Sequence, residues 1–202
     1  MQTDSRPPCE LCLDLANTLR WPASDHPVET LLNYADLIGW ACRFEVLTPQ
    51  EADHFLKETQ SRADEGQEVY KRGIELRGSI YRIVCSHLQN RPAPPDDLGR
   101  LNQELETAHR YLRIFPTEDG YQLVWAKDFI RLDRVLWRVA RSAADLLVSS
   151  ETLSRVGQCA DDRGCGWLFI DWSKNRSRRW CDINDCGNRA KQRRHYERSR
   201  KH

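Results

Sequence analysis

Four cysteines near the carboxyl end constrain this chain more than any other feature. Cys159, Cys165, Cys181 and Cys186 follow the pattern C-x5-C-x15-C-x4-C. Two close pairs separated by a longer loop are typical of a tetrahedral zinc site, because a tight turn can carry each pair and the loop can bring the pairs together. A segment this short with few aliphatic side chains also needs a metal ion or a cross-link to fold, because burial alone stabilises it poorly. The pattern favours one structural Zn²⁺ over buried small residues or a redox set.

The loop between the two cysteine pairs has the composition of a β-hairpin. Residues 166–171 (GWLFID) are the expected first strand, residues 173–177 form a polar turn, and residues 178–180 return toward Cys181. We expect this hairpin to bury Trp167, Phe169 and Trp180 in part against the metal site.

A cationic stretch begins three residues after the last cysteine. It runs from Arg189 to Lys201 with the sequence RAKQRRHYERSRK. We expect about three helical turns, with Asn188 as the N-cap after the turn at Gly187. Because no apolar face is visible beyond Ala190 and Tyr196, the pattern favours an exposed helix that faces an anionic ligand over a solvated tail without a partner.

Charge is divided unevenly along the chain. The net charge of the whole sequence is +1, but residues 155–202 hold 13 Lys and Arg against 6 Asp and Glu, a net charge of +7. The other 154 residues hold 18 against 24, a net charge of −6. The division predicts an acidic body that nucleic acid would repel and a basic end that it would attract, although the body's negative excess can also serve solubility alone.

Length and composition place the chain among globular proteins. Of its 202 residues, 40% are hydrophobic and 30% are charged, so it can bury a real core. No apolar run approaches the roughly 20 residues of a membrane span, and the first residues lack the apolar stretch of a signal peptide. We therefore expect no membrane partner and a cytoplasmic location, where cysteines stay reduced and are more often metal ligands than disulfides.

The segment before the cysteines shows mainly helical periodicity. Apolar residues recur at helical spacing in five stretches, which predicts helices near residues 11–19, 31–42, 68–89, 98–108 and 132–147. Composition changes after residues 149–150. We therefore predict a mainly α protein, with a helical domain in residues 1–152 and a small treble-clef-like zinc finger, a β-hairpin and a helix, in residues 153–202.

Local signals predict further element boundaries in the body. Residues 48–51 (TPQE) form a capping box with proline at the first helical position, and the helix that they start runs to about residue 62. Asp96 or Asp97 is the expected N-cap of one later helix, and Asp128 of the last. Residues 112–115 and 121–125 flank the turn sequence EDG, which predicts one β-hairpin.

Two groups of residues resemble a known family. Residues 186–189 (CGNR), preceded by residues 165–171 (CGWLFID) and 178–181 (RRWC), resemble the CGNR-type zinc finger. Residues 11–18 (LCLDLANT) are similar to the start of the ABATE domain, which precedes that finger in bacteria. The resemblance implies a bacterial transcription regulator, sometimes described as stress-induced, with a DNA-binding finger whose metal ligands are Cys159, Cys165, Cys181 and Cys186.

The remaining cysteines offer weaker signals. Cys9 and Cys12 form a C-x-x-C pair, but the βαβ context of a redox motif is missing. Cys42 and Cys85 sit singly in apolar helical segments. We interpret Cys12, Cys42 and Cys85 as core residues, and the role of the Cys9 and Cys12 pair stays open.

Asp14 and Asn17 are polar residues within an apolar stretch, and they share one helical face. We favour a helix cap or a hydrogen-bond bridge to neighbouring segments over the alternative, a small-molecule pocket that they line together with Arg77. The sequence contains no nucleophile elbow, phosphate loop, dinucleotide fingerprint or H-E-x-x-H. We therefore do not expect an enzyme, which would need a site in the helical body.

The favoured function is a zinc-binding, DNA-binding transcription regulator whose body senses a small effector or forms a homodimer. Cations of the finger would contact phosphates and a groove edge, namely Arg176, Arg178, Arg179, Arg189, Lys191, Arg193, Arg194 and Arg198. The alternative is a zinc module that binds RNA or a protein without preference for duplex DNA.

Overall fold

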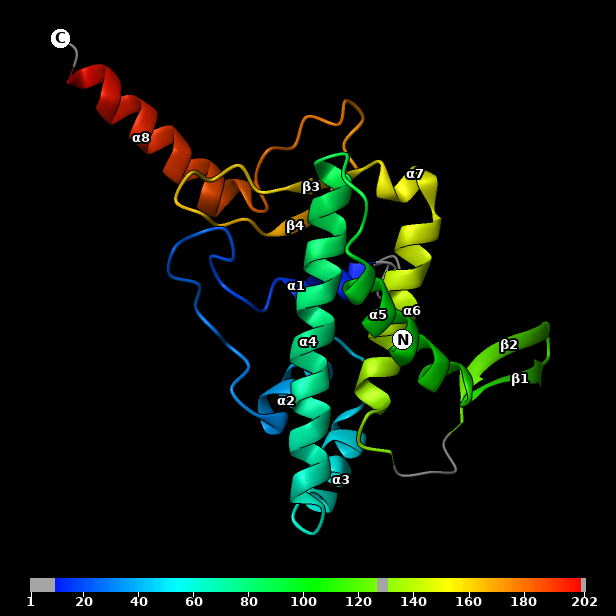
Figure 1. Ribbon diagram of the computed structural model, residues 1–202. Helices are drawn as coiled ribbons and strands as arrows, with labels where there is room; N and C mark the ends of the chain where they lie inside the picture. The colour runs from blue at the N-terminus through cyan, green and yellow to red at the C-terminus, as the bar shows by residue number, and fades with distance from the viewer. Residues whose placement is uncertain (1–9, 127–130, 201–202) are drawn as a thin grey trace.

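The body is built around one long helix. A computed structural model describes residues 10–126 and 131–200 of the protein. Helix α4 (Ala63–Leu88) runs through the middle of the molecule, and α1 (Leu11–Ala16), α5 (Pro95–His109) and α6 (Arg134–Val148) pack against it (Figure 1). Helices α2 (Tyr34–Arg43) and α3 (Pro49–Glu58) pair with each other beside α4. None of the described helices combines the length and the apolar character that crossing a membrane requires.

Helix α6 is held by burial. Its side chains Val135, Leu136, Val139 and Leu146 recur at helical spacing and are fully buried against α1 and α5. This confirms the apolar stripe predicted for residues 132–147. The expected N-cap Asp128 lies outside the described residues, and α6 begins directly after Asp133.

The predicted helix starts have different outcomes. The capping box is confirmed, because the Thr48 side chain accepts from the Glu51 N–H and the Glu51 carboxylate accepts from the Thr48 N–H. The prediction that Asp96 or Asp97 caps α5 is wrong, because α5 begins at Pro95. The buried Asp97 instead accepts hydrogen bonds from Ser79 and Arg82 of α4.

The hairpin predicted in the body is confirmed. Strands β1 (Leu112–Thr117) and β2 (Gly120–Trp125) pair antiparallel, with Leu112 opposite Trp125 and Thr117 opposite Gly120. Gly120 has φ +137°, which favours glycine at this turn. The hairpin projects from the body in Figure 1, and its side chains Ile114, Tyr121 and Leu123 are exposed.

The finger's hairpin differs from the predicted one. After the short helix α7 (Ser150–Leu153), strand β3 (Val156–Gln158) pairs with β4 (Leu168–Ile170), so the hairpin encloses the first cysteine pair. The expected pairing of residues 166–171 with residues 178–180 is wrong. The reason is burial: Val156, Leu168 and Ile170 lie in the same apolar core as the body helices, whereas the exposed segment after Asp171 has no core to join.

The mainly α fold class is confirmed, with two small antiparallel hairpins and a cysteine-containing finger. The apolar core extends across the boundary predicted near residue 152, and that boundary stays a prediction. Helix α8 (Asn188–Ser199) follows the last cysteine and points away from the body at one end of the molecule (Figure 1).

Candidate metal centre and nucleic-acid interface

Four thiols converge where the finger meets the body. The sulfur atoms of Cys159, Cys165, Cys181 and Cys186 all lie within 4.8 Å of one another. Cys181 Sγ lies 3.6 Å from both Cys165 Sγ and Cys186 Sγ. Tetrahedral Zn–S bonds of ~2.3 Å place the sulfur atoms roughly 3.8 Å apart, so the cluster fits one zinc ion. Cys159, separated from Cys165 by the longest gap within a pair, is part of the cluster.

The thiols perturb one another's ionisation. Hydrogen bonding from Cys181 is the main cause that lowers the pKa of Cys165 to about 6. The same hydrogen bond and then burial raise the pKa of Cys181, and burial raises that of Cys186. Four thiolates at this spacing repel one another, and a divalent cation compensates that charge. The finger is thus a site for one structural zinc ion, held by all four predicted cysteines.

The loop between the first two cysteines approaches the body closely. Gly164 has φ +87°, and a Cβ at this position would lie 2.6 Å from backbone atoms of Ser24. Its carbonyl oxygen accepts from the Ala23 N–H at 3.1 Å. Trp21, in the same body segment, packs against the cysteine cluster. A glycine therefore allows the metal loop to lie directly on the chain that follows α1.

Asp161 links the metal loop to α8. Its carboxylate is buried and accepts from Arg189 Nε at 3.1 Å and Nη2 at 3.0 Å. Burial would raise the pKa of Asp161, but hydrogen bonds from the Arg163 N–H and the Arg189 side chain outweigh it and lower the pKa. Arg189 also donates to Asp185 and to the Cys186 sulfur. This arginine therefore positions the start of α8 on the metal site.

Helix α8 begins differently from the prediction. One π-helical turn, η2 (Ile183–Gly187), precedes it, and Asp182 is the N-cap whose side chain accepts from the Asn184 N–H at 2.7 Å. Asn188 was the expected cap, but it already lies within the continuous helical run and donates to the Asn184 carbonyl. Cys186 therefore sits inside the helical turn that leads into α8, so the metal site sets the direction of the helix.

Three of the eight predicted nucleic-acid contacts bind carbonyl or carboxylate oxygens of the finger. Arg178 donates to the carbonyls of Ile170, Trp180 and Cys181 and stacks over Phe169. Arg189 binds Asp161, and Arg193 forms an ion pair with Asp162. The charge pattern did not separate such structural cations from free ones.

Other predicted cations are exposed. Arg179 and Arg176 lie on the segment after β4, and Lys191 and Arg198 lie on α8. The side chain of Arg194 lies outside the described part of the chain. Lys174 and Arg200, which were not predicted as contacts, are exposed as well.

The three predicted pocket residues do not form one site. The Asn17 amide bridges α1 to β4: it donates to the Leu168 carbonyl at 2.8 Å and accepts from the Leu168 N–H at 2.9 Å. Arg77 is buried and bound to Glu29 and Thr18. Asp14 and Asn17 line a cavity of about 530 Å³, and Arg77 is not among its lining residues.

Sequence reasoning missed two contributors to the site, Asp161 and Trp21. The acidic pair at residues 161–162, between two of the cysteines in a chain segment that ends in a basic helix, was a usable signal for Asp161. Trp21 carries no local signal, because its contact with the cluster spans more than 130 residues of chain.

A helical body joined to a four-cysteine centre and a basic helix defines a zinc-finger protein. Two family models match it: ABATE, described as "Putative stress-induced transcription regulator", over residues 10–150, and the CGNR zinc finger over residues 155–199. The chain belongs to the ABATE family and carries a CGNR zinc finger, as the sequence motifs predicted. A search of curated protein sequences finds no match.

Proposed function

We propose that the protein is a DNA-binding transcription regulator whose zinc finger contacts the duplex. The observation that carries the proposal is the placement of α8: it starts on the metal centre and projects from the body with exposed cations (Figure 1). Membership in a family described as transcription regulators supports the same function.

The cations left exposed are numerous enough for phosphate binding. They lie on residues 171–180, on α8 and at the C-cap of α8, and comprise Lys174, Arg176, Arg179, Lys191, Arg198 and Arg200. Each phosphate neutralised on duplex DNA contributes about −0.9 to the log–log dependence of affinity on salt. Contacts with four to six phosphates therefore give a slope of about −4 to −5.

Fluorescence anisotropy of labelled duplex DNA over a salt series tests the proposal. The double variant Lys191→Glu/Arg198→Glu is expected to weaken binding at low salt and to flatten the slope by about 2. Lys71→Glu is the matched control, because Lys71 is an exposed cation on α4 in the body. Two results would contradict DNA contact through α8: affinity that does not depend on salt, or an equal loss of affinity in the double variant and in Lys71→Glu.

A single-stranded RNA and a structured RNA in the same titration test the alternative, an RNA-binding finger. Preference for either RNA would favour it, and retention of a protein partner with no nucleic-acid binding would favour a protein-docking module. We propose that the protein acts by binding, without a chemical step, and that it works in the cytoplasm. We also propose that it forms a homodimer, which light scattering of the full chain tests.

We further propose that the 530 Å³ cavity is the effector site. It lies between α1, α2 and the finger residue Trp167, so its occupant would touch both parts of the molecule. Its lining carries both signs of charge and three aromatic rings: Asp14, Arg20, Asp36, Arg43, Trp40, Phe44 and Trp167. This chemistry fits a small polar molecule that contains a ring.

Gly39 provides a direct test of this cavity. It lines the cavity, and a Cβ added there meets nothing within 4 Å, so Gly39→Leu should fill the space without a clash. A panel of amino acids and nucleosides is titrated while tryptophan fluorescence is followed. At least one compound should change the emission of the natural protein and not of Gly39→Leu. Gly99→Leu, at an equally open position on α5, is the control. A response that survives Gly39→Leu, or no response in the natural protein, would contradict an effector site here.

A further inference from the structure

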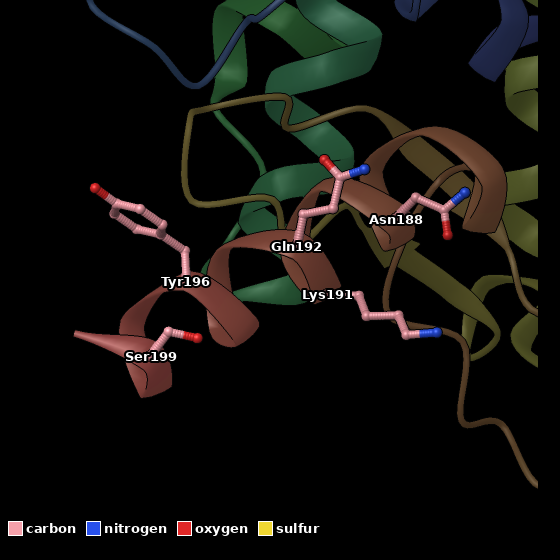
Figure 2. A pocket seen from close by; sticks show the side chains of 5 residues that line it. All are labelled: Asn188, Lys191, Gln192, Tyr196 and Ser199. Carbon is pink, nitrogen blue, oxygen red and sulfur yellow. The ribbon is translucent and has the colours of Figure 1, made fainter. Parts of the chain in front are cut away.

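The side of α8 that faces away from the finger carries a row of polar side chains. Ala190 is buried toward the finger. At ~100° per residue, Asn188, Gln192 and Ser199 lie on the opposite side of the helix, with Tyr196 next to them. These four residues, here named the outer row, line an open groove together with Lys191 (Figure 2).

The inner side of α8 is already engaged. Arg189 is bound to Asp161, and Arg193 is paired with Asp162, so both cations are tied to the loop that holds the first cysteine pair. The outer row lies on the side of the helix away from these ion pairs, and its four residues are exposed. Figure 2 shows Gln192 and Tyr196 extending from α8.

The chemistry of the outer row suits the edge of a base pair. Asn188 and Gln192 are exposed amides one helical turn apart. An amide side chain can accept from the N6 amino group of adenine and donate to its N7, a pairing available only in the major groove of DNA. Asn188 also donates to the Asn184 carbonyl at 2.9 Å, which fixes the orientation of its side chain.

The dimensions and charge of α8 fit the same ligand. The helix has 12 residues and is therefore ~18 Å long, and a major groove about 12 Å wide admits an α-helix. The exposed Lys191 and Arg198 lie on the flank of the outer row, where phosphates border a groove. The deep, narrow major groove of A-form RNA excludes such a helix, so duplex DNA is the favoured ligand.

We propose that α8 enters the major groove with the outer row toward the bases, and that Gln192 selects adenine. This inference rests on the proposed DNA-binding function. It goes further because it separates one base-reading residue from the cations that only bind phosphate.

The test is a selection from random duplex DNA by the zinc-loaded full chain. The natural protein is expected to enrich sites with adenine at a defined position. Gln192→Ala should reduce discrimination at that position by about 5- to 150-fold. Gln192→Arg should change the preferred base there from adenine to guanine, because arginine pairs with O6 and N7 of guanine. Gln103→Ala, an exposed glutamine on α5, is the matched control and should leave the selected sites unchanged.

The outcomes separate the two levels of the proposal. Sites that are the same for the natural protein, Gln192→Ala and Gln192→Arg would overturn the role of Gln192 while DNA binding stands. Duplex binding without any base preference would also overturn it. Failure of the natural protein to bind any duplex would overturn the proposed function itself. Zinc content and circular dichroism confirm that each exposed-residue variant is folded.

Discussion

Helices α6 and α8 are held in place by opposite means. Helix α6 presents an apolar stripe that is fully buried among α1, α4 and α5. Among the described side chains of α8, Ala190 is the one buried apolar residue, and the position of the helix depends on Cys186 and on the ion pairs of Arg189 and Arg193. A helix that is anchored at one end by a metal centre need not bury a face, so most of its surface stays available to a ligand.

Removal of one zinc ligand should have the largest effect, and that effect should fall on α8 and on the turn of residues 183–187 that precedes it, not on α6. A structural zinc site contributes on the order of 10 kcal/mol to folding of the unit that binds it. Cys186→Ser is therefore expected to lose zinc on dialysis and to lose the helicity of α8, as measured by metal analysis and circular dichroism. Cys42→Ser, at a half-buried cysteine in α2, should retain zinc. Full zinc content in Cys186→Ser would contradict the four-cysteine site.

A cavity created in the core beside α6 should destabilise the body and leave the zinc site intact. Leu146 of α6 is fully buried, so Leu146→Ala is expected to lower the free energy of unfolding by about 2–5 kcal/mol in urea titrations. Zinc content should stay unchanged. Leu147→Ala, at the half-buried neighbouring position, should cost less. Zinc loss in Leu146→Ala under native conditions would show that the metal centre depends on the packing of α6.

The contact between Asp161 and Arg189 should contribute less to stability than a zinc ligand or the Leu146 side chain. Hydrogen bonds to charged groups contribute about 1.5–3 kcal/mol, so Asp161→Asn should raise amide exchange in α8 by roughly 10- to 100-fold while zinc is retained. Asp162→Asn is the control, because Asp162 is exposed and surface pairs contribute about 0–1 kcal/mol. Equal effects of the two variants would contradict the assigned role of Asp161.

Asp97 should make the stability of the body depend weakly on pH. Its hydrogen bond from Arg82 is the main cause that lowers the pKa of Asp97 below the ordinary value. The folded state then holds fewer protons than the unfolded state near that value. Stability from Asp97 is thus fully present above pH ~3.9 and is lost as the pH falls below it. Urea titrations from pH 6 to 3 should show a weaker decline for Asp97→Asn, and an identical decline would contradict this assignment.

The sequence predicted those features of the fold that depend on residues close together in the chain. The α6 stripe, the Thr48 capping box and the β1–β2 turn each depend on residues close in sequence, and all three are confirmed. The β3–β4 pairing was missed, because the strand Val156–Gln158 is too short to show alternation and is selected by its contact with the body core. Arg189 could not be told from a free cation, because only the fold brings the buried carboxylate of Asp161 near it. Arg178 could not be told from one either, because its partners are backbone carbonyls, which carry no sequence signal.

The most direct test of metal anchoring is amide hydrogen exchange of the full chain before and after zinc is removed with a chelator. We predict that α8 and the preceding turn of residues 183–187 lose protection, whereas α6 keeps it. Loss of protection in α6 and α8 together, or retention in both, would contradict the conclusion that burial holds one helix and the metal centre the other.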